Sequence, residues 1–424
     1  MDGTSRALAA AFLVALLLRL GWVYAVDSVP VEDDDTSFYH TTAINIADGH
    51  GFARNQDDGQ RAVTAWHPPG YSYFLGGLYT LTGDSVRAGQ IANSVLGALT
   101  VLPVFIIGRY FYSAKIGVAS AWVVALLPPL VFFTSSLMTE SLFAFLMAAG
   151  VALIVSARSP TGVRLPILAL AGVFIGVTML VRAQALVLLP LALVWLALPS
   201  VRSLSWRSVA VITLPIVLVV GAWTLRNVQE MDSFVLITTD AGYNFRAGHA
   251  PYSTGGWLAP EDLRRDAPSD NLTERELYYQ REGLKRGLEY LTAHPVREVE
   301  LSVRKVAHLW RPATDALGRA ESRGATPINE TAFMALDGLQ MMTHLLFGAA
   351  VIAGLLLWRG SKDVVILTVV LVGLWTAGHI VIFAQPRFNV PVLPVLTPVA
   401  VAGAVLLAER ARHLIAGRDL QTAA

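Results

Sequence analysis

The residues of this chain best suited to proton transfer are four consecutive carboxylates, Glu32 to Asp35. They follow directly on an apolar segment, so we expect them at a membrane interface. Reduced solvation and like charges there raise the pKa of a carboxyl group and make it a competent proton acceptor. One of the four is therefore a candidate general base. An acidic run by itself is more often a solvated loop or a topology signal, and its neighbours must decide between the two interpretations.

Two more residues on the same predicted side of the membrane could act with this run. His67 lies in the sequence WHPPGY, a rigid turn that could hold its imidazole against a phosphate. Glu140 ends the polar turn TSSLMTE and begins an apolar helix. Taken alone, His67 is an ordinary interfacial histidine, and Glu140 is a capping carboxylate worth about 0.3 to 1 kcal/mol.

Several cations could bind an anion beside these acids. Arg182 separates two apolar stretches, where an unpaired guanidinium costs about 2.5 to 3.5 kcal/mol, so we expect it to have a partner. Arg226, Lys305 and Arg387 lie near the outer ends of other apolar segments, where they either converge on one anion or extend to lipid headgroups. Arg19, inside the first apolar segment, is expected to reach the interface or to pair with the acidic run.

The composition indicates that the chain that carries these residues is a membrane protein. Of 424 residues, 54% are hydrophobic and only 15% are charged, which lies outside the range of soluble domains. The net charge of +1 gives no reason to expect nucleic-acid binding. The chain has no cysteine, which excludes disulfides, thiolate nucleophiles and cysteine-ligated metals.

The apolar segments predict an all-α polytopic fold with about ten transmembrane helices. Basic residues concentrate at the helix ends and loops on one side of the membrane, which is therefore the cytoplasmic side. Both termini then lie in the cytoplasm, and the protein is expected in the plasma or inner membrane. The predicted spans are 7–26, 88–108, 116–133, 137–156, 165–181, 183–199, 207–225, 337–357, 364–383 and 389–408.

Two polar stretches, 27–87 and 226–336, then fall on the extracytoplasmic side. We divide the chain accordingly into an N-terminal transmembrane module (1–225) with a catalytic first outer loop (27–87), an extracytoplasmic loop region (226–336), and C-terminal transmembrane helices with a short cytoplasmic tail (337–424). The loop region is expected to hold two helices near the membrane surface, the second beginning at Pro295.

The motifs, in their order along most of the chain, resemble those of a known family. Asp35 with Tyr39 four residues later is followed by INIADGHGF and by HPPGY. The segments SLMTESLF, GVFIGVTMLVR, WTLRN, TDAGYNFRAGHAP and QPRFNVPVLP come next. Together they resemble the membrane GT-C glycosyltransferases of the protein-mannosyltransferase and aminoarabinose-transferase type, which take a sugar from polyprenyl phosphate.

The resemblance implies a role for each candidate residue and for the partners of the chain. The donor is a polyprenyl-phosphate-linked sugar whose tail lies among the membrane lipids, and the acceptor is a hydroxyl of a lipid, glycan or protein. The implied catalytic residues are Asp35, with Asp34 as the alternative, and Glu140. The implied donor-phosphate ligands are His67, Arg182, Arg226, Lys305 and Arg387, and the implied substrate-binding residues are Tyr39, Tyr71 and Asn244.

The predicted reaction follows from the charges. A base removes the acceptor proton, the oxygen attacks the anomeric carbon, and the departing phosphate needs cations rather than a proton donor. A single displacement of this kind inverts the anomeric centre. We expect no metal or other cofactor, although Asp33 to Asp35 could serve a divalent ion.

Three other classes of membrane protein compete with this interpretation. A transporter or flippase of a lipid-linked sugar would hold its polar residues deep within broken helices. An O-antigen polymerase or ligase would use lipid diphosphate donors and arginine-rich loops. A scaffold without activity would tolerate Asp35→Asn and Asp34→Asn. The position of the acids at one membrane face favours the glycosyltransferase.

Overall fold

The chain is almost entirely helical. The computed structural model describes residues 3–26, 28–32, 34–56, 59–323 and 328–422, so Asp33 lies outside the described residues. Two short antiparallel hairpins interrupt the helices. Strand β1 (Ala53–Asn55) pairs with β2 (Arg61–Val63), and β3 (Arg158–Ser159) pairs with β4 (Gly162–Val163).

Six helical segments among the described residues are long and apolar enough to cross a membrane. A seventh is a pair of helices bent by 57° at Pro128, formed by α6 (Ala114–Leu126) and the segment Pro128–Ser135, which comprises α7 (Pro128–Phe132) and η1 (Phe133–Ser135). The six are α1 (Gly3–Val26), α4 with α5 (Val86–Leu99, Val101–Phe111), α11 (Trp206–Met231), α17 (Glu330–Leu357), α18 (Lys362–Val381) and η3 (Pro386–Val392) with α19 (Leu393–Thr422).

The remaining three predicted spans are shorter apolar helices. They are α8 (Glu140–Ser156), α9 (Leu165–Val181) and the broken pair η2 (Ala183–Val187) and α10 (Leu188–Ala197). Each of the ten predicted segments therefore contains an apolar helix, but a count of ten membrane crossings is not confirmed. Two of the shorter helices are bounded at one end by a charged residue: α8 begins at Glu140, and α9 ends just before Arg182.

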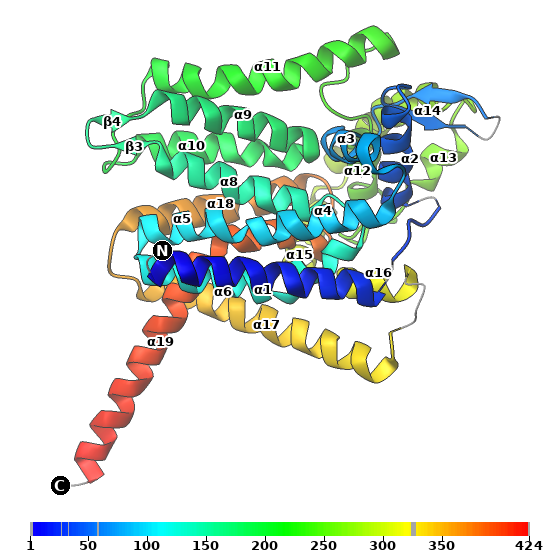
Figure 1. Cartoon of the computed structure of the whole chain (residues 1–424). Coiled ribbons are helices and arrows are strands. Elements are labelled where there is room, and N and C mark those ends of the chain that lie inside the picture. The colour runs from blue at the N-terminus through cyan, green and yellow to red at the C-terminus, as the bar shows by residue number, and fades with distance from the viewer. Residues whose placement is uncertain (1–2, 27, 33, 57–58, 324–327, 423–424) are drawn as a thin grey trace.

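The long helices lie side by side, and the two ends of the bundle differ (Figure 1). One end carries the N-terminus and the β3–β4 hairpin, and α19 projects from the bundle there. The other end gathers helices from the two polar stretches: α2 (Asp35–Ala47), α3 (Gly70–Thr82), α12 (Asp240–Gly248), α13 (Glu261–Arg265) and α14 (Leu272–Ala293). The two polar stretches of the sequence therefore meet at a single end of the molecule.

The second polar stretch is more helical than expected. Helices α14 and α15 (Pro295–Trp310) meet at Pro295, as the sequence predicted. Helices α12, α13 and α16 (Asp315–Arg323) were not predicted. The turn-rich sequence before α13 contains α12 because glycines allow it to press against α14: a Cβ atom on Gly283 would lie 2.2 Å from the carbonyl oxygen of Gly242.

Arg19 in α1 neither reaches the interface nor pairs with the acidic run, so that prediction is wrong. Its side chain is fully buried, and its guanidinium donates to the carbonyl oxygens of Val124 at 3.2 Å and Ala125 at 3.0 Å. In a continuous helix those carbonyls would accept from residues 128 and 129, which here are prolines without an N–H. Arg19 replaces the two missing donors at the break in the span.

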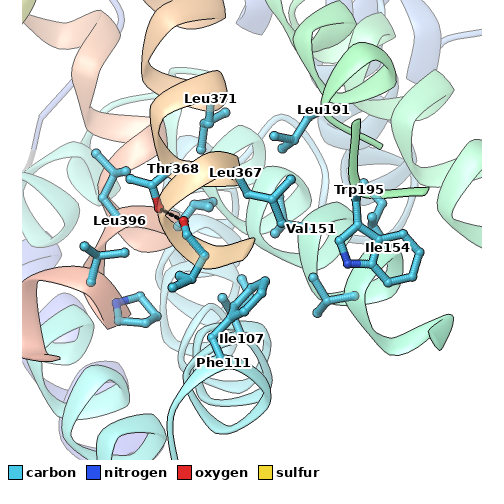
Figure 2. Close-up of a pocket in the computed structure, with 15 residues that line it drawn as sticks. Ile107, Phe111, Val151, Ile154, Leu191, Trp195, Leu367, Thr368, Leu371 and Leu396 are labelled. Atoms are coloured by element: carbon cyan, nitrogen blue, oxygen red, sulfur yellow. Dashed lines mark hydrogen bonds between the residues drawn. The ribbon is translucent and has the colours of Figure 1, made fainter. Parts of the chain in front are cut away.

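An apolar pocket lies inside the bundle, between α5, α8, α10, α18 and α19. Figure 2 shows Trp195, Leu191 and Leu367 among the side chains around it, with Thr368 as a polar group whose hydroxyl bonds its own helix. None of the predicted catalytic or phosphate-binding residues lines this pocket. The polar residues that could do chemistry gather elsewhere.

Candidate active site

Asp35 is the first residue of α2 and lies between two cationic groups. Its Oδ2 accepts a hydrogen bond from Nη1 of Arg387 at 3.0 Å, and its Oδ1 lies 3.4 Å from Nε2 of His67. Arg387 belongs to η3, more than 350 residues further along the chain. The helix N-terminus also favours negative charge at this position. The site therefore holds an ionised carboxylate by charge-assisted contacts from two sides.

His67 bridges two carboxylates. Its Nδ1 lies 3.0 Å from Oδ2 of Asp240, the first residue of α12, and its Nε2 faces Asp35. The ring of Phe38 meets the imidazole edge-on at 4.8 Å, and the ring of Tyr39 lies 5.5 Å away. An imidazole with an acceptor at each nitrogen fits the doubly protonated cation. His67 is therefore a fixed positive charge in this site.

The charges in the site move two pKa values in opposite directions. Burial disfavours the ionised form of Asp35, but Arg387, His67 and Arg319 outweigh it and hold the pKa of this carboxyl well below its ordinary range. Burial also opposes charging of His67, yet Asp240 and Asp35 raise the pKa of its imidazole to about 9. The prediction of a raised pKa for the general base is wrong for Asp35, because cations rather than like charges are its closest neighbours.

Asp34, next to Asp35, caps helix α2 and forms an ion pair with Arg319. Its Oδ1 accepts from the backbone N–H of Thr36, which caps α2, and its Oδ2 lies 3.1 Å from Nη1 of Arg319 on α16. Arg319 was not predicted as a site residue, and its charge interacts with those of both Asp35 and Glu140. The acidic run thus divides: Asp34 ties α16 to α2, and Asp35 faces the site.

Glu140 and Arg182 form a second, deeper ion pair. Nη2 of Arg182 donates to Oε1 of Glu140 at 3.1 Å, and only 1% of the Glu140 side chain is exposed. Arg182 thereby has the partner that its position requires. The guanidinium carbons of Arg182 and Arg387 both lie 5.5 Å from the centre of the Phe388 ring, so one ring joins the two ion pairs.

Tyr39 is a buried tyrosine whose hydroxyl is subject to the charges of both ion pairs. Burial and the negative charge of Asp35 raise the pKa of its hydroxyl well above the ordinary range, and the charges of Arg182, Glu140 and Arg387 also act on it. Its ring packs edge-on against Tyr71, whose hydroxyl and the Asn93 amide exchange hydrogen bonds. Tyr39 therefore borders the charged site, while Tyr71 is fully buried behind it.

The structure does not bring every predicted residue to this cluster. Arg226 donates to the carbonyl oxygens of Phe52 at 2.8 Å and Thr64 at 2.9 Å. Lys305 is buried and donates to the carbonyl oxygen of Ile380 at 2.9 Å, and burial lowers its pKa to about 8. Both side chains bind backbone rather than facing Asp35. Asn244 lies one turn after Asp240 on α12.

Three residues that the sequence analysis missed hold the site together: Asp240, Arg319 and Glu276. Glu276 on α14 is buried and accepts from the Thr64 hydroxyl at 2.7 Å, the Ala65 N–H at 3.2 Å and the Thr239 hydroxyl at 3.1 Å. It thereby joins the loop that carries His67 to the start of α12. A glutamate in the second turn of a polar helix gives no sequence signal of this role.

No group of three or more His, Cys, Asp or Glu side chains among the described residues could hold a metal ion. The Asp34 and Asp35 carboxylates each have an arginine in contact. A cation placed beside either carboxylate would therefore meet the positive charge of Arg319 or Arg387.

Two comparisons with known proteins find similarity. Residues 66–223 match the family model of dolichyl-phosphate-mannose-protein mannosyltransferases, a range that contains His67, Glu140 and Arg182. The fold resembles the archaeal oligosaccharyltransferase AglB from Archaeoglobus fulgidus, in complex with an inhibitory peptide and a dolichol-phosphate, with a TM-score of 0.56 and 13% identity. The apo form of that enzyme gives a TM-score of 0.57 and 14% identity.

The match to the archaeal enzyme covers 99% of this chain but only 52% of the other, so this chain spans about half of its length. ArnT from Cupriavidus metallidurans bound to undecaprenyl phosphate gives a TM-score of 0.43 at 14% identity, over 97% of this chain and 79% of that one. No curated protein matches the sequence. The resemblance to the membrane GT-C glycosyltransferases predicted from the sequence is confirmed, and the chain is a multi-pass membrane protein with a GT-C-like fold.

Proposed function

We propose that this protein is a glycosyltransferase that moves a sugar from a polyprenyl-phosphate donor to an acceptor hydroxyl on the extracytoplasmic face of a plasma or inner membrane. The observation that carries the proposal is the position of Asp35, an ionised carboxylate between Arg387 and His67 at the polar end of the bundle. A base and phosphate-binding cations in contact are what this transfer needs.

The reaction uses the charges in a defined order. The donor phosphate competes with Asp35 for Arg387, and loss of that contact raises the proton affinity of Asp35 at the moment when the donor is in place. Asp35 then takes the proton of the acceptor hydroxyl, whose oxygen bonds to the anomeric carbon. The bond from that carbon to the phosphate oxygen breaks, and its electron pair leaves with the phosphate. Attack from the opposite face inverts the anomeric centre.

The cations that receive the phosphate are Arg387, Arg182 and His67, with Arg319 at the edge of the site. His67 remains protonated at neutral pH because Asp240 raises its pKa, so it acts as a charge rather than as a base. Glu140 fixes the direction of the Arg182 guanidinium. Tyr39 and Asn244 border the space available to the sugar or acceptor.

Arg226, Lys305 and Tyr71 have positioning roles in this proposal. Arg226 holds the first outer loop through the Thr64 carbonyl, three residues before His67. Lys305 bonds the end of α18 at Ile380, a few residues before Arg387. The dolichol-phosphate bound to the archaeal enzyme supports a polyprenyl phosphate as the donor carrier.

The test compares three substitutions within one acidic run. Asp35→Asn keeps the shape of the side chain but removes its basicity, and we expect transfer to fall about 10² to 10⁴-fold. Asp34→Asn keeps the oxygen that caps α2 and should lose far less. Glu32→Gln, on an exposed side chain of the run, is the matched control.

The measurement is glycan and lipid-linked sugar analysis of a deletion strain complemented with each variant, with membrane insertion checked by immunoblot. Accumulation of unused lipid-linked sugar with Asp35→Asn is the expected result. Unchanged glycan in Asp35→Asn and in the Asp34→Asn/Asp35→Asn double variant, with both proteins inserted, would refute the glycosyltransferase.

A further inference from the structure

A small cavity that shares Glu140 with the charged site lies between α1, α4, α7, η1, α8 and η3. Its apolar walls come mainly from Leu130, Phe133 and Val390. Its polar lining comes from four side chains: Arg19 on α1, Thr100 at the junction of α4 and α5, and Glu140 and Ser141 on α8. Arg19 and Glu140 are the charged members of this lining, and both are almost completely buried.

Each of the two charged side chains has one buried polar atom without a hydrogen-bond partner among the described residues. These atoms are Nε of Arg19 and Oε2 of Glu140. A buried polar atom that is left unpaired costs about 1 to 3 kcal/mol, and more when the group is charged. Because both side chains line the same cavity, one ligand held there could satisfy both atoms.

Neither side chain can turn away to find another partner. The other oxygen of Glu140 accepts from Arg182 at 3.1 Å. The terminal nitrogens of Arg19 donate to the carbonyls of Ala15, Val124 and Ala125, two of which lost their helical donors to prolines. Gly97 leaves room for the guanidinium, since a Cβ atom there would lie 2.6 Å from Nε of Arg19.

The two unpaired atoms define the chemistry of the ligand. Nε of Arg19 is a donor and requires an acceptor, while Oε2 of Glu140 is an acceptor and requires a donor. A metal cation would meet the positive charge of Arg19, and an anion would meet Glu140. Water donates and accepts at once, and buried waters in proteins make about three hydrogen bonds to such groups. The hydroxyl of Ser141 or Thr100 can supply the third.

We propose that one buried water molecule in this cavity bridges Nε of Arg19 and Oε2 of Glu140, and that Arg19 thereby positions Glu140. The bridge would make Arg19 a positioning residue of the site, since Glu140 in turn directs Arg182. Only the importance of Glu140 for transfer rests on the proposed function. The water bridge itself is a statement about the folded protein.

The direct test is a high-resolution structure of the protein in lipid nanodiscs. Density for one water within hydrogen-bond distance of Nε of Arg19 and Oε2 of Glu140 is the expected result. The same density should be absent in Gly97→Ala, where the added methyl group displaces the guanidinium. A direct bond of Nε to a protein atom, with no density in the cavity, would overturn the proposal.

The energetic test is a double-mutant cycle on thermal unfolding in detergent, which needs no activity. If Arg19 and Glu140 are coupled through water, Arg19→Met/Glu140→Gln should lose less stability than the sum of the single losses, by about 2 °C or more in Tm. Arg87→Met is the matched control, because Arg87 also donates to a carbonyl of α1, at Val23. The decrease in Tm caused by Arg87→Met should add to the decrease caused by Glu140→Gln.

The variant Arg19→Lys keeps the cycle interpretable if Arg19→Met does not fold, since lysine retains the charge but lacks Nε–H. Additive losses for Arg19 and Glu140 in both cycles would show that Arg19 acts only on the α6–α7 break, and would overturn the bridge. Because neither readout is transferase activity, this failure is distinct from failure of Asp35→Asn.

Discussion

At the scale of single residues, the site is a set of paired opposite charges rather than one activated acid. Asp35 has Arg387 and His67 as partners, and His67 has Asp240 as well. These contacts keep Asp35 ionised and His67 charged at neutral pH. The opposite charges of such a site balance one another, and in the proposed function the donor phosphate would take over some of the cationic contacts.

The imidazole of His67 should titrate far above an ordinary histidine. We expect a midpoint near pH 9, and a lower one in Asp240→Asn, because that change removes the carboxylate at Nδ1. Histidine-labelled NMR in nanodiscs measures the midpoint, with His67→Gln to assign the signal and Asp270→Asn, on an exposed carboxylate, as the control.

The sign of the linked stability follows from the same shift. The folded pKa of His67 lies above its unfolded value near 6.5, so its contribution is complete below about pH 6.5 and disappears as the pH rises through about 9. A wild-type midpoint near 6.5, or one unaffected by Asp240→Asn, would contradict the imidazolium assigned here.

At the scale of elements, the contact of α12 with α14 places Asp240. The two helices cross where Gly242 faces Gly283, and Glu276 on α14 accepts from Thr239 just before Asp240. The backbone N–H of Thr239 also donates to the Ala65 carbonyl at 2.8 Å. The distance from Asp240 to His67 therefore depends on how closely the backbones of α12 and α14 approach each other.

Gly283→Ala should weaken both the fold and the site. Its Cβ atom would meet the Gly242 carbonyl at 2.2 Å, and such overpacking costs about 1 to 3 kcal/mol. We expect a lower Tm, a lower His67 midpoint as Asp240 moves away, and a loss of transfer of about 10-fold or more. Gly77→Ala on α3 is the control, because no atom lies within 4 Å of its added Cβ. Equal Tm, His67 midpoint and transfer activity in the two variants would show that the crossing of α12 and α14 does not position Asp240.

At the scale of the whole molecule, the two polar loops meet at one end, and the N-terminus and the β3–β4 hairpin lie at the other (Figure 1). Basic residues in the sequence assign the hairpin end to the cytoplasm. In the proposed function, the site would then face outward, with the tail of the lipid-linked donor in the bilayer beside the bundle.

Because the chain has no cysteine, its orientation can be tested with single introduced thiols. Asp270→Cys, before α14, should react in intact cells with a membrane-impermeant maleimide. Thr161→Cys, in the β3–β4 turn, should react only after the membrane is opened. Both positions are exposed in the folded chain, so a lack of reaction reports the side of the membrane. The reverse pattern would place the site in the cytoplasm.

The sequence by itself determined the membrane class, the apolar segments and the main members of the charged set. Composition and segment length suffice for the first two. Asp35, His67, Glu140, Arg182 and Arg387 all lie at helix ends or in adjoining loops on one predicted side, so a correct topology already brings them to one end of the bundle. Their motifs supplied the resemblance, which depends on local order along the chain.

Only the tertiary structure decided which charges touch. His67 meets Asp240 across 173 residues and Asp35 meets Arg387 across 352, and these partners reverse the predicted shift in the pKa of Asp35. Arg226 and Lys305 carry the same charge but bind backbone carbonyls instead. Electrostatic energy falls steeply with distance and burial, and neither quantity can be read from a residue's type or its place in the chain.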